Sequence, residues 1–145
     1  MVHLSSQSLS DFIRQTITGF RPDCERLAIS LELNIEDVSV PYQSNIIRTG
    51  VVTLMENSIA SMSSGGELEV NLIDSEFQWE LEVADSGTRN RNTSGNHEPS
   101  TLEAVSLALG GSVQTWKCPL GGLAHVLIVP KRNTGNKAQS GRRAA

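Results

Sequence analysis

The residues of this chain that are best placed for chemistry fall in two short stretches. One is Asp85-Ser86-Gly87, at the end of an apolar run, and the other is Asn57, next to Glu56 inside a helical pattern. A carboxylate at the end of a buried strand lies at the edge of the sheet, and a glycine beside it lets the backbone approach a ligand closely. Asp and Asn also favour turns and helix caps, so ordinary structural roles remain open for both. If the two stretches form a ligand site, we expect the amide of Asn57 on the helix and the carboxylate of Asp85 at the strand end to face each other across one pocket.

The helix that positions Asn57 is predicted over residues 45–61, with Ser44 as its N-cap. Gly50 inside this helix costs about 1 kcal/mol relative to alanine, so another element is expected to pack closely against it. The apolar residues recur at spacings of three and four, which is the stripe that a helix presents to a sheet. They are Ile47, Val51, Leu54, Met55, Ile59 and Met62.

The strand that leads to Asp85 is predicted over residues 78–84, paired with residues 67–73 as two antiparallel strands. Apolar and polar residues alternate in both, and the outer side of the strand 67–73 is acidic, which is typical of a sheet with one wet face. Two further hairpins are predicted. One joins residues 27–33 to 38–40, and the other joins 112–117 to 123–129.

Two more helices complete the predicted order of elements. The first opens at Ser8, closes at Gly19 to Pro22 and leads into a polar link, and the second spans residues 101–109 with Ser100 as its cap. Residues 88–100 have no apolar anchor and are predicted to form a long mobile loop, a kind that is usually functional or disordered. Strands paired as hairpins with helices between them predict an α+β chain, a two-layer sandwich with a mixed, mostly antiparallel sheet and helices on one face.

Length and charge set the broad class of the protein. A chain of 145 residues predicts one domain, placed at residues 1–130, followed by a basic tail at 131–145 that is expected to be disordered. Five of the 12 basic residues lie in that tail, so residues 1–130 carry seven basic residues against 16 acidic ones. The acidic body argues against nucleic-acid binding. No apolar run approaches the roughly 20 residues that cross a bilayer, and no signal peptide is recognised, so a cytoplasmic location without membrane contact is expected.

Three stretches together resemble a known family. They are Leu54 to Ser61 (LMENSIAS), Ser64 to Val70 (SGGELEV) and Leu81 to Gly87 (LEVADSG). In this order they are similar to the ATP-binding domain of sensor histidine kinases, which belongs to the ATPase superfamily that also includes type II topoisomerases and certain heat-shock chaperones. The resemblance runs from about Ser8 to Pro130, and the order of the elements is its most specific part. It implies the same two-layer fold.

The resemblance also implies a role for four residues. Asn57 would help to hold the Mg²⁺ that bridges the phosphates of ATP, and Asp85 would accept a hydrogen bond from the adenine amino group. Gly87 would keep the backbone clear of the purine, and Gly122 matches a glycine of the closing motif of the family. An amide oxygen suits a hard cation that keeps most of its waters.

Several positions depart from the family pattern. Thr53 stands where an Asn or a Glu is usual, Ala60 where a basic residue is common, and Arg89 replaces the second glycine of the Asp-x-Gly-x-Gly motif. Residues 94–101 contain one glycine where a glycine-rich phosphate lid is expected, and Leu123 replaces a threonine that supports the adenine carboxylate. Arg89 or Arg91 could supply phosphate contacts in place of the lid, although solvated loop charges are the simpler interpretation.

The resemblance implies the ATP-binding domain of a two-component histidine kinase, which positions Mg-ATP for phosphoryl transfer to a histidine on a separate domain. The partner would be a phosphoacceptor histidine domain or a response regulator, and a homodimer is compatible with this assignment. Two alternatives stay open: a non-catalytic module of the same fold that serves as a docking or dimerisation domain in signalling, and an anti-sigma-type serine kinase. The departures leave enzymatic activity an open question.

Overall fold

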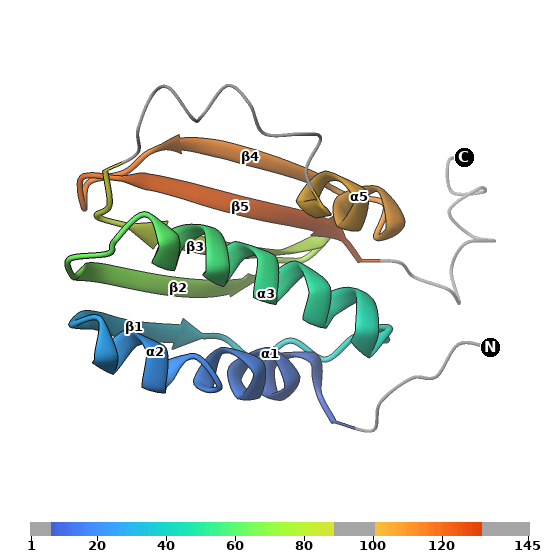
Figure 1. Ribbon diagram of the computed structural model, residues 1–145. Coiled ribbons are helices and arrows are strands. Elements are labelled where there is room, and N and C mark those ends of the chain that lie inside the picture. The colour runs from blue at the N-terminus through green and yellow to red at the C-terminus, as the bar shows by residue number, and fades with distance from the viewer. Residues whose placement is uncertain (1–6, 89–100, 132–145) are drawn as a thin grey trace, which may run out of the picture.

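The computed structural model describes residues 7–88 and 101–131 of the chain. They form one five-stranded sheet in the order β1-β2-β3-β5-β4, with the helices packed on one face (Figure 1). The elements are α1 (Leu9–Thr18), α2 (Arg21–Arg26), β1 (Ile29–Ile35), α3 (Ser44–Ala60), β2 (Gly66–Asp74), β3 (Gln78–Asp85), α5 (Thr101–Ala108), β4 (Ser112–Lys117) and β5 (Leu123–Pro130). The predicted α+β two-layer sandwich is confirmed.

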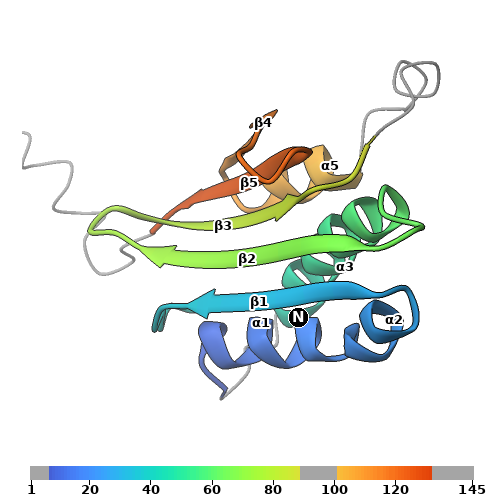
Figure 2. The same ribbon diagram turned by 90° about the vertical axis from the view of Figure 1, so that its left-hand side faces the viewer.

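The pairing of β1 corrects one prediction. β1 pairs with β2 in parallel, Leu33 opposite Val70, and residues 36–40 form no strand, so the predicted hairpin of 27–33 with 38–40 is wrong. The reason is a competing partner on α1. The backbone N–H of Val38 donates to Ser10 Oγ at 3.1 Å, and the carbonyl of Val38 accepts from Ser10 N at 3.2 Å. Val38 is therefore held by α1, and the chain reaches β2 only after passing through α3 (Figure 2).

Two helix starts also differ from prediction. The polar link after the first helix is itself a short helix, α2, and Pro22 lies in its first turn, where the missing N–H of proline costs nothing. Ser44 is the first residue of α3 and not its cap. The carbonyl of Gln43, in an extended conformation, accepts from both Ile46 N and Ile47 N at 3.2 Å.

The core lies between α3 and the sheet, as the apolar stripe predicted. Met55 and Leu54 have no exposed surface, and a β-carbon on Gly50 would lie 3.0 Å from Val105 Cγ1 of α5, which confirms close packing at that glycine. Apolar residues of β2 and β3 complete this layer: Leu68, Val70, Leu72, Trp79, Leu81 and Val83. No helix within residues 7–88 and 101–131 is long and apolar enough to cross a lipid bilayer.

The other face of β1, β2 and β3 is polar, as predicted for the outer side of β2. Glu32 lies opposite Glu69 across the parallel pair, and Asn71 lies opposite Glu82. Side-chain amides connect these acids. Asn34 Nδ2 donates to Glu69 at 3.2 Å and Asn71 Nδ2 donates to Glu82 at 2.8 Å.

Candidate functional site

Asp85 ends β3 on the helix-covered face and is fully buried. Its carboxylate oxygen Oδ1 accepts the backbone N–H of Gly87 at 3.0 Å and that of Leu123 at 3.4 Å. Its main-chain carbonyl accepts from Gly122 N at 3.0 Å and from Cys118 Sγ at 3.3 Å. The carboxylate is thus held in place by the chain that follows it and by the first residues of β5.

Two glycines make this arrangement possible. A β-carbon on Gly122 would clash with Asp85 Oδ1 and would lie 2.5 Å from the carbonyl oxygen of Asp85. A β-carbon on Gly87 would clash with Ser61 Oγ and lie 2.5 Å from the carbonyl oxygen of Ser61, just beyond the end of α3. Backbone atoms cannot move aside as a flexible side chain can, so both positions require glycine.

Asn57 is exposed on α3. It lies seven residues after Gly50 and four before Ser61, so these three residues share one flank of the helix. That flank faces α5, β5 and the end of β3, because Gly50 packs against Val105 and Leu127, while Ser61 touches Gly87. Asn57 is therefore about one helical turn away from the point where α3 meets the Asp85-Gly87 strand end.

The structure brings the four predicted site residues to the same end of the fold. Gly122, Asp85 and Gly87 form one contiguous set of contacts. Asn57 lies on the helix flank that borders them. At this end of the fold Asn57 is exposed and Asp85 has no exposed surface.

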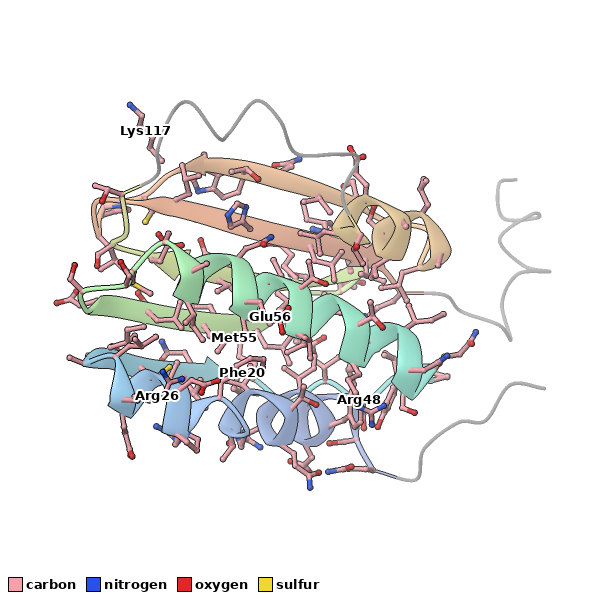
Figure 3. The ribbon with its side chains drawn as sticks, viewed as in Figure 1. Phe20, Arg26, Arg48, Met55, Glu56 and Lys117 are labelled. Atoms are coloured by element: carbon pink, nitrogen blue, oxygen red, sulfur yellow. The ribbon has the colours of Figure 1, made fainter. Side chains whose placement is uncertain are left out.

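The positions that depart from the family pattern lie on α3, at the start of β5 and outside the described residues. Thr53 is half-buried on α3 and carries no carboxylate, and Ala60 is exposed. Glu56 is exposed on α3 (Figure 3) and lies about 100° around the helix from Asn57. Leu123 has no hydroxyl to offer Asp85 but still donates its backbone N–H. Arg89, Arg91 and residues 94–100 of the expected lid lie outside the described residues.

Three contact residues were missed by sequence reasoning. The thiol of Cys118 donates a hydrogen bond to the carbonyl of Asp85, and Ser61 packs against Gly87. The hydroxyl of Ser86 accepts a hydrogen bond from Glu67 N at 2.9 Å. Each contact joins residues far apart in the chain. The only local signal was the position of Cys118 in the turn of the predicted last hairpin, which places it beside Gly122.

The protein offers few oxygen ligands to a cation at this end of the fold, so a bound molecule would have to supply most of the coordination. Within the described residues, no group of three or more His, Cys, Asp or Glu side chains could hold a metal ion. Asn57 offers a single exposed amide. Mg²⁺ is commonly bound by one or two protein oxygens together with phosphates and waters, so one amide is enough where a nucleotide supplies the rest.

The two cysteines are predicted to differ in reactivity. Burial, reinforced by the nearby carboxylate of Asp23, raises the pKa of the Cys24 thiol, so less of it is thiolate at neutral pH, whereas Cys118 is half-buried at the candidate site. Iodoacetamide at pH 7.5 should modify Cys118 faster than Cys24, by on the order of tenfold. Peptide mass spectrometry over time measures both rates. Equal rates, or faster modification of Cys24, would contradict the assigned environments.

Comparison with known proteins was made by sequence and by structure. No family model matches the sequence, and no curated protein matches it. Solved structures do match. The catalytic domain of the histidine kinase ThkA superimposes with a TM-score of 0.70 at 17% identity, covering 90% of this chain and 97% of that domain. This chain has the fold of a histidine kinase catalytic domain.

Two further histidine kinases give the same result. Acinetobacter baumannii AdeS matches with a TM-score of 0.73 at 17% identity, covering 92% of this chain and 70% of that one. Full-length ShkA, solved in complex with AMPPNP, matches with a TM-score of 0.73 at 14% identity, covering 92% of this chain and 32% of that one. ThkA has also been solved in complex with the response regulator TrrA. At these identities the histidine kinase fold is shared, and the chemistry must be argued from the residues.

Proposed function

We propose that this chain is the ATP-binding domain of a two-component histidine kinase and that it binds a magnesium nucleotide between Asn57 and Asp85. The observation that carries the proposal is the buried carboxylate of Asp85, held by two backbone N–H groups and enclosed by two obligatory glycines. These contacts fix the carboxylate of Asp85, a hydrogen-bond acceptor, in one orientation. A fixed carboxylate selects a ligand with an amino donor, as adenine has.

The burial of Asp85 strengthens that selection. In a buried site a hydrogen bond to a charged acceptor is stronger than in solvent, so a ligand that offers a donor to Asp85 gains more affinity than one that does not. Guanine presents a carbonyl where adenine presents its amino group. The proposed site therefore favours adenine nucleotides over guanine nucleotides.

Asn57 would contact the cation on the phosphate side of the nucleotide. Phosphoryl transfer depends on positioning and charge stabilisation more than on covalent chemistry by the protein. The task of this domain is then to present the γ-phosphate to a histidine on a separate domain. No catalytic base is assigned, because Thr53 cannot act as one and Glu56 lies around the helix from Asn57.

The same proposal covers the domain limits and the partners. The proposed domain limits are residues 1–130 for the nucleotide-binding domain, with the basic stretch 131–145 assigned to a tail. The partner is a phosphoacceptor histidine domain or a response regulator, and the binding of TrrA to ThkA supports the latter by analogy of fold. The setting is cytoplasmic signal transduction.

Calorimetric titration with Mg-ATP, Mg-ADP and Mg-GTP tests the proposal. Saturable binding of both adenine nucleotides, with GTP at least about tenfold weaker, is the expected result. Phosphotransfer to a supplied histidine domain, with a serine substrate as comparison, would then separate a histidine kinase from a serine kinase. Absence of heat at millimolar nucleotide would rule out nucleotide binding.

Removing the amide of Asn57 should affect only the metal-dependent part of binding. For Asn57→Ala we expect a roughly 10-fold weaker affinity for Mg-ADP, since one cation contact is lost, and little change for ADP in EDTA. Asn57 is exposed, so its truncation should leave the thermal stability unchanged. The exposed residue Asn45 at the start of α3 provides the matched control, Asn45→Ala. An equal loss with and without magnesium would argue against the cation role.

A non-catalytic docking module of the same fold is the second candidate. One departure on α3 favours it: Thr53 stands at a position where the family has a carboxylate or amide. This candidate predicts a stable fold with no nucleotide binding. The titration described above distinguishes the two directly.

A further inference from the structure

Ser86 lies between the two residues of the proposed adenine site and joins three elements. Its backbone N–H donates to the carbonyl of Glu67 at 3.1 Å, and its Oγ accepts the backbone N–H of Glu67 at 2.9 Å. The same hydroxyl donates to Met62 Sδ at 3.8 Å. One side chain therefore connects the end of β3 to the first residues of β2 and to the chain just beyond α3.

The space around that hydroxyl is filled. A β-carbon on Gly66 would lie 2.5 Å from Ser86 Oγ and 2.8 Å from Met62 Sδ, and Met62 is itself buried. On the other side, Gly87 packs against Ser61 without room for a β-carbon. Because the two contacts flank Ser86, the C-terminal end of α3 cannot shift relative to the strand end without breaking one of them.

That junction determines where Asn57 lies relative to Asp85. Asn57 is four residues before Ser61 and five before Met62, within about one and a half turns of the junction. Asp85 is also held from outside the junction, because its carboxylate accepts from Leu123 N at 3.4 Å and its carbonyl accepts from Gly122 N at 3.0 Å. Loosening the junction would therefore move the proposed cation ligand more than the proposed adenine acceptor.

We propose that Ser86 is a positioning residue that sets the separation between the metal side and the adenine side of the nucleotide site. The inference rests on the proposed function. Ser86 would not touch the nucleotide itself. It would act through Met62, just beyond the end of α3, while its bonds to the backbone of Glu67 hold it to the start of β2.

The test compares a whole nucleotide with its base portion. For Ser86→Ala we expect about a tenfold weaker affinity for Mg-ADP, since small displacements of positioning groups have large effects, and less than a twofold change for adenosine in NMR titrations. Met62→Leu keeps the volume but removes the sulfur acceptor, and should shift Mg-ADP affinity in the same direction by a smaller factor. Ser63→Ala, at an exposed serine next to Met62, should match the wild type.

The outcomes separate the inference from the proposed function. Wild-type protein that binds neither adenosine nor Mg-ADP overturns both. Wild-type binding with an unchanged Ser86→Ala variant, or with equal losses for adenosine and Mg-ADP, overturns the positioning role alone. If Ser86→Ala does not fold, Met62→Leu carries the same comparison, and an equal effect on both ligands contradicts the inference.

Discussion

Replacing Asp85 by asparagine should weaken Mg-ADP binding by at least about 100-fold and leave the fold intact. Asparagine keeps an oxygen that can accept the N–H groups of Gly87 and Leu123, at 3.0 and 3.4 Å in the wild type. It loses the negative charge and brings an NH₂ group that cannot accept a hydrogen bond from the amino group of adenine. Loss of a charge-assisted hydrogen bond in a buried site has an effect of this size. Calorimetry measures the affinity, and circular dichroism measures the fold.

The matched control for this variant is Asp37→Asn. Asp37 is exposed and precedes Val38 on the connection between β1 and α3, so the same loss of charge occurs away from the candidate site. It should bind Mg-ADP as the wild type does. A similar loss of affinity in both variants would mean that net charge, and not the Asp85 carboxylate, governs binding.

The second large effect is expected at Gly122. In Gly122→Ala the new β-carbon would clash with the carboxylate of Asp85, would lie 2.5 Å from its carbonyl oxygen and 2.8 Å from Gly87 N. These neighbours are backbone and a fixed side chain, so β5 must move away from β3 at this point. We expect the free energy of unfolding to fall by about 2–3 kcal/mol. The melting temperature should fall by roughly 6–10 °C, and nucleotide binding should be lost.

Gly19→Ala is the comparison for that variant. Gly19 ends α1 with ordinary helical angles, and a β-carbon there meets only the carbonyl of Thr16 at 3.3 Å. Its melting temperature should change by no more than about 2 °C. A Gly122→Ala protein as stable as Gly19→Ala, and still able to bind Mg-ADP, would show that the β3-β5 contact is not tight.

Local patterns predicted most of the fold, because the spacing of apolar residues in each strand and helix indicates which of its faces is buried. The alternation of Leu81 and Val83 in β3, and the spacing of Leu54 and Met55 in α3, both correspond to buried residues. The segment containing Val38 and Val40 has the same alternation, yet its backbone pairs with Ser10. An alternating pattern shows that a segment has one apolar side, but it does not indicate which other segment its backbone pairs with.

The residues of the candidate site also differ in whether the sequence indicated them. Asp85, Gly87 and Gly122 were identifiable because a short motif and its glycines reflect close backbone approach. Ser86 lies within the predicted motif but was given no role, and Ser61 gave no signal. Their contacts with Met62 and Gly87 exist only once α3, β2 and β3 have met, and serine at a turn has many ordinary explanations.

The most direct test is an NMR titration of the wild-type protein with Mg-ADP, following backbone amides and the side-chain amide of Asn57. We predict the largest shifts at Gly87, Leu123 and the Asn57 side chain, with Ser30 and Glu69 on the polar face of the sheet unchanged. Shifts confined to that polar face, or a spectrum that stays the same at millimolar nucleotide, would contradict the account.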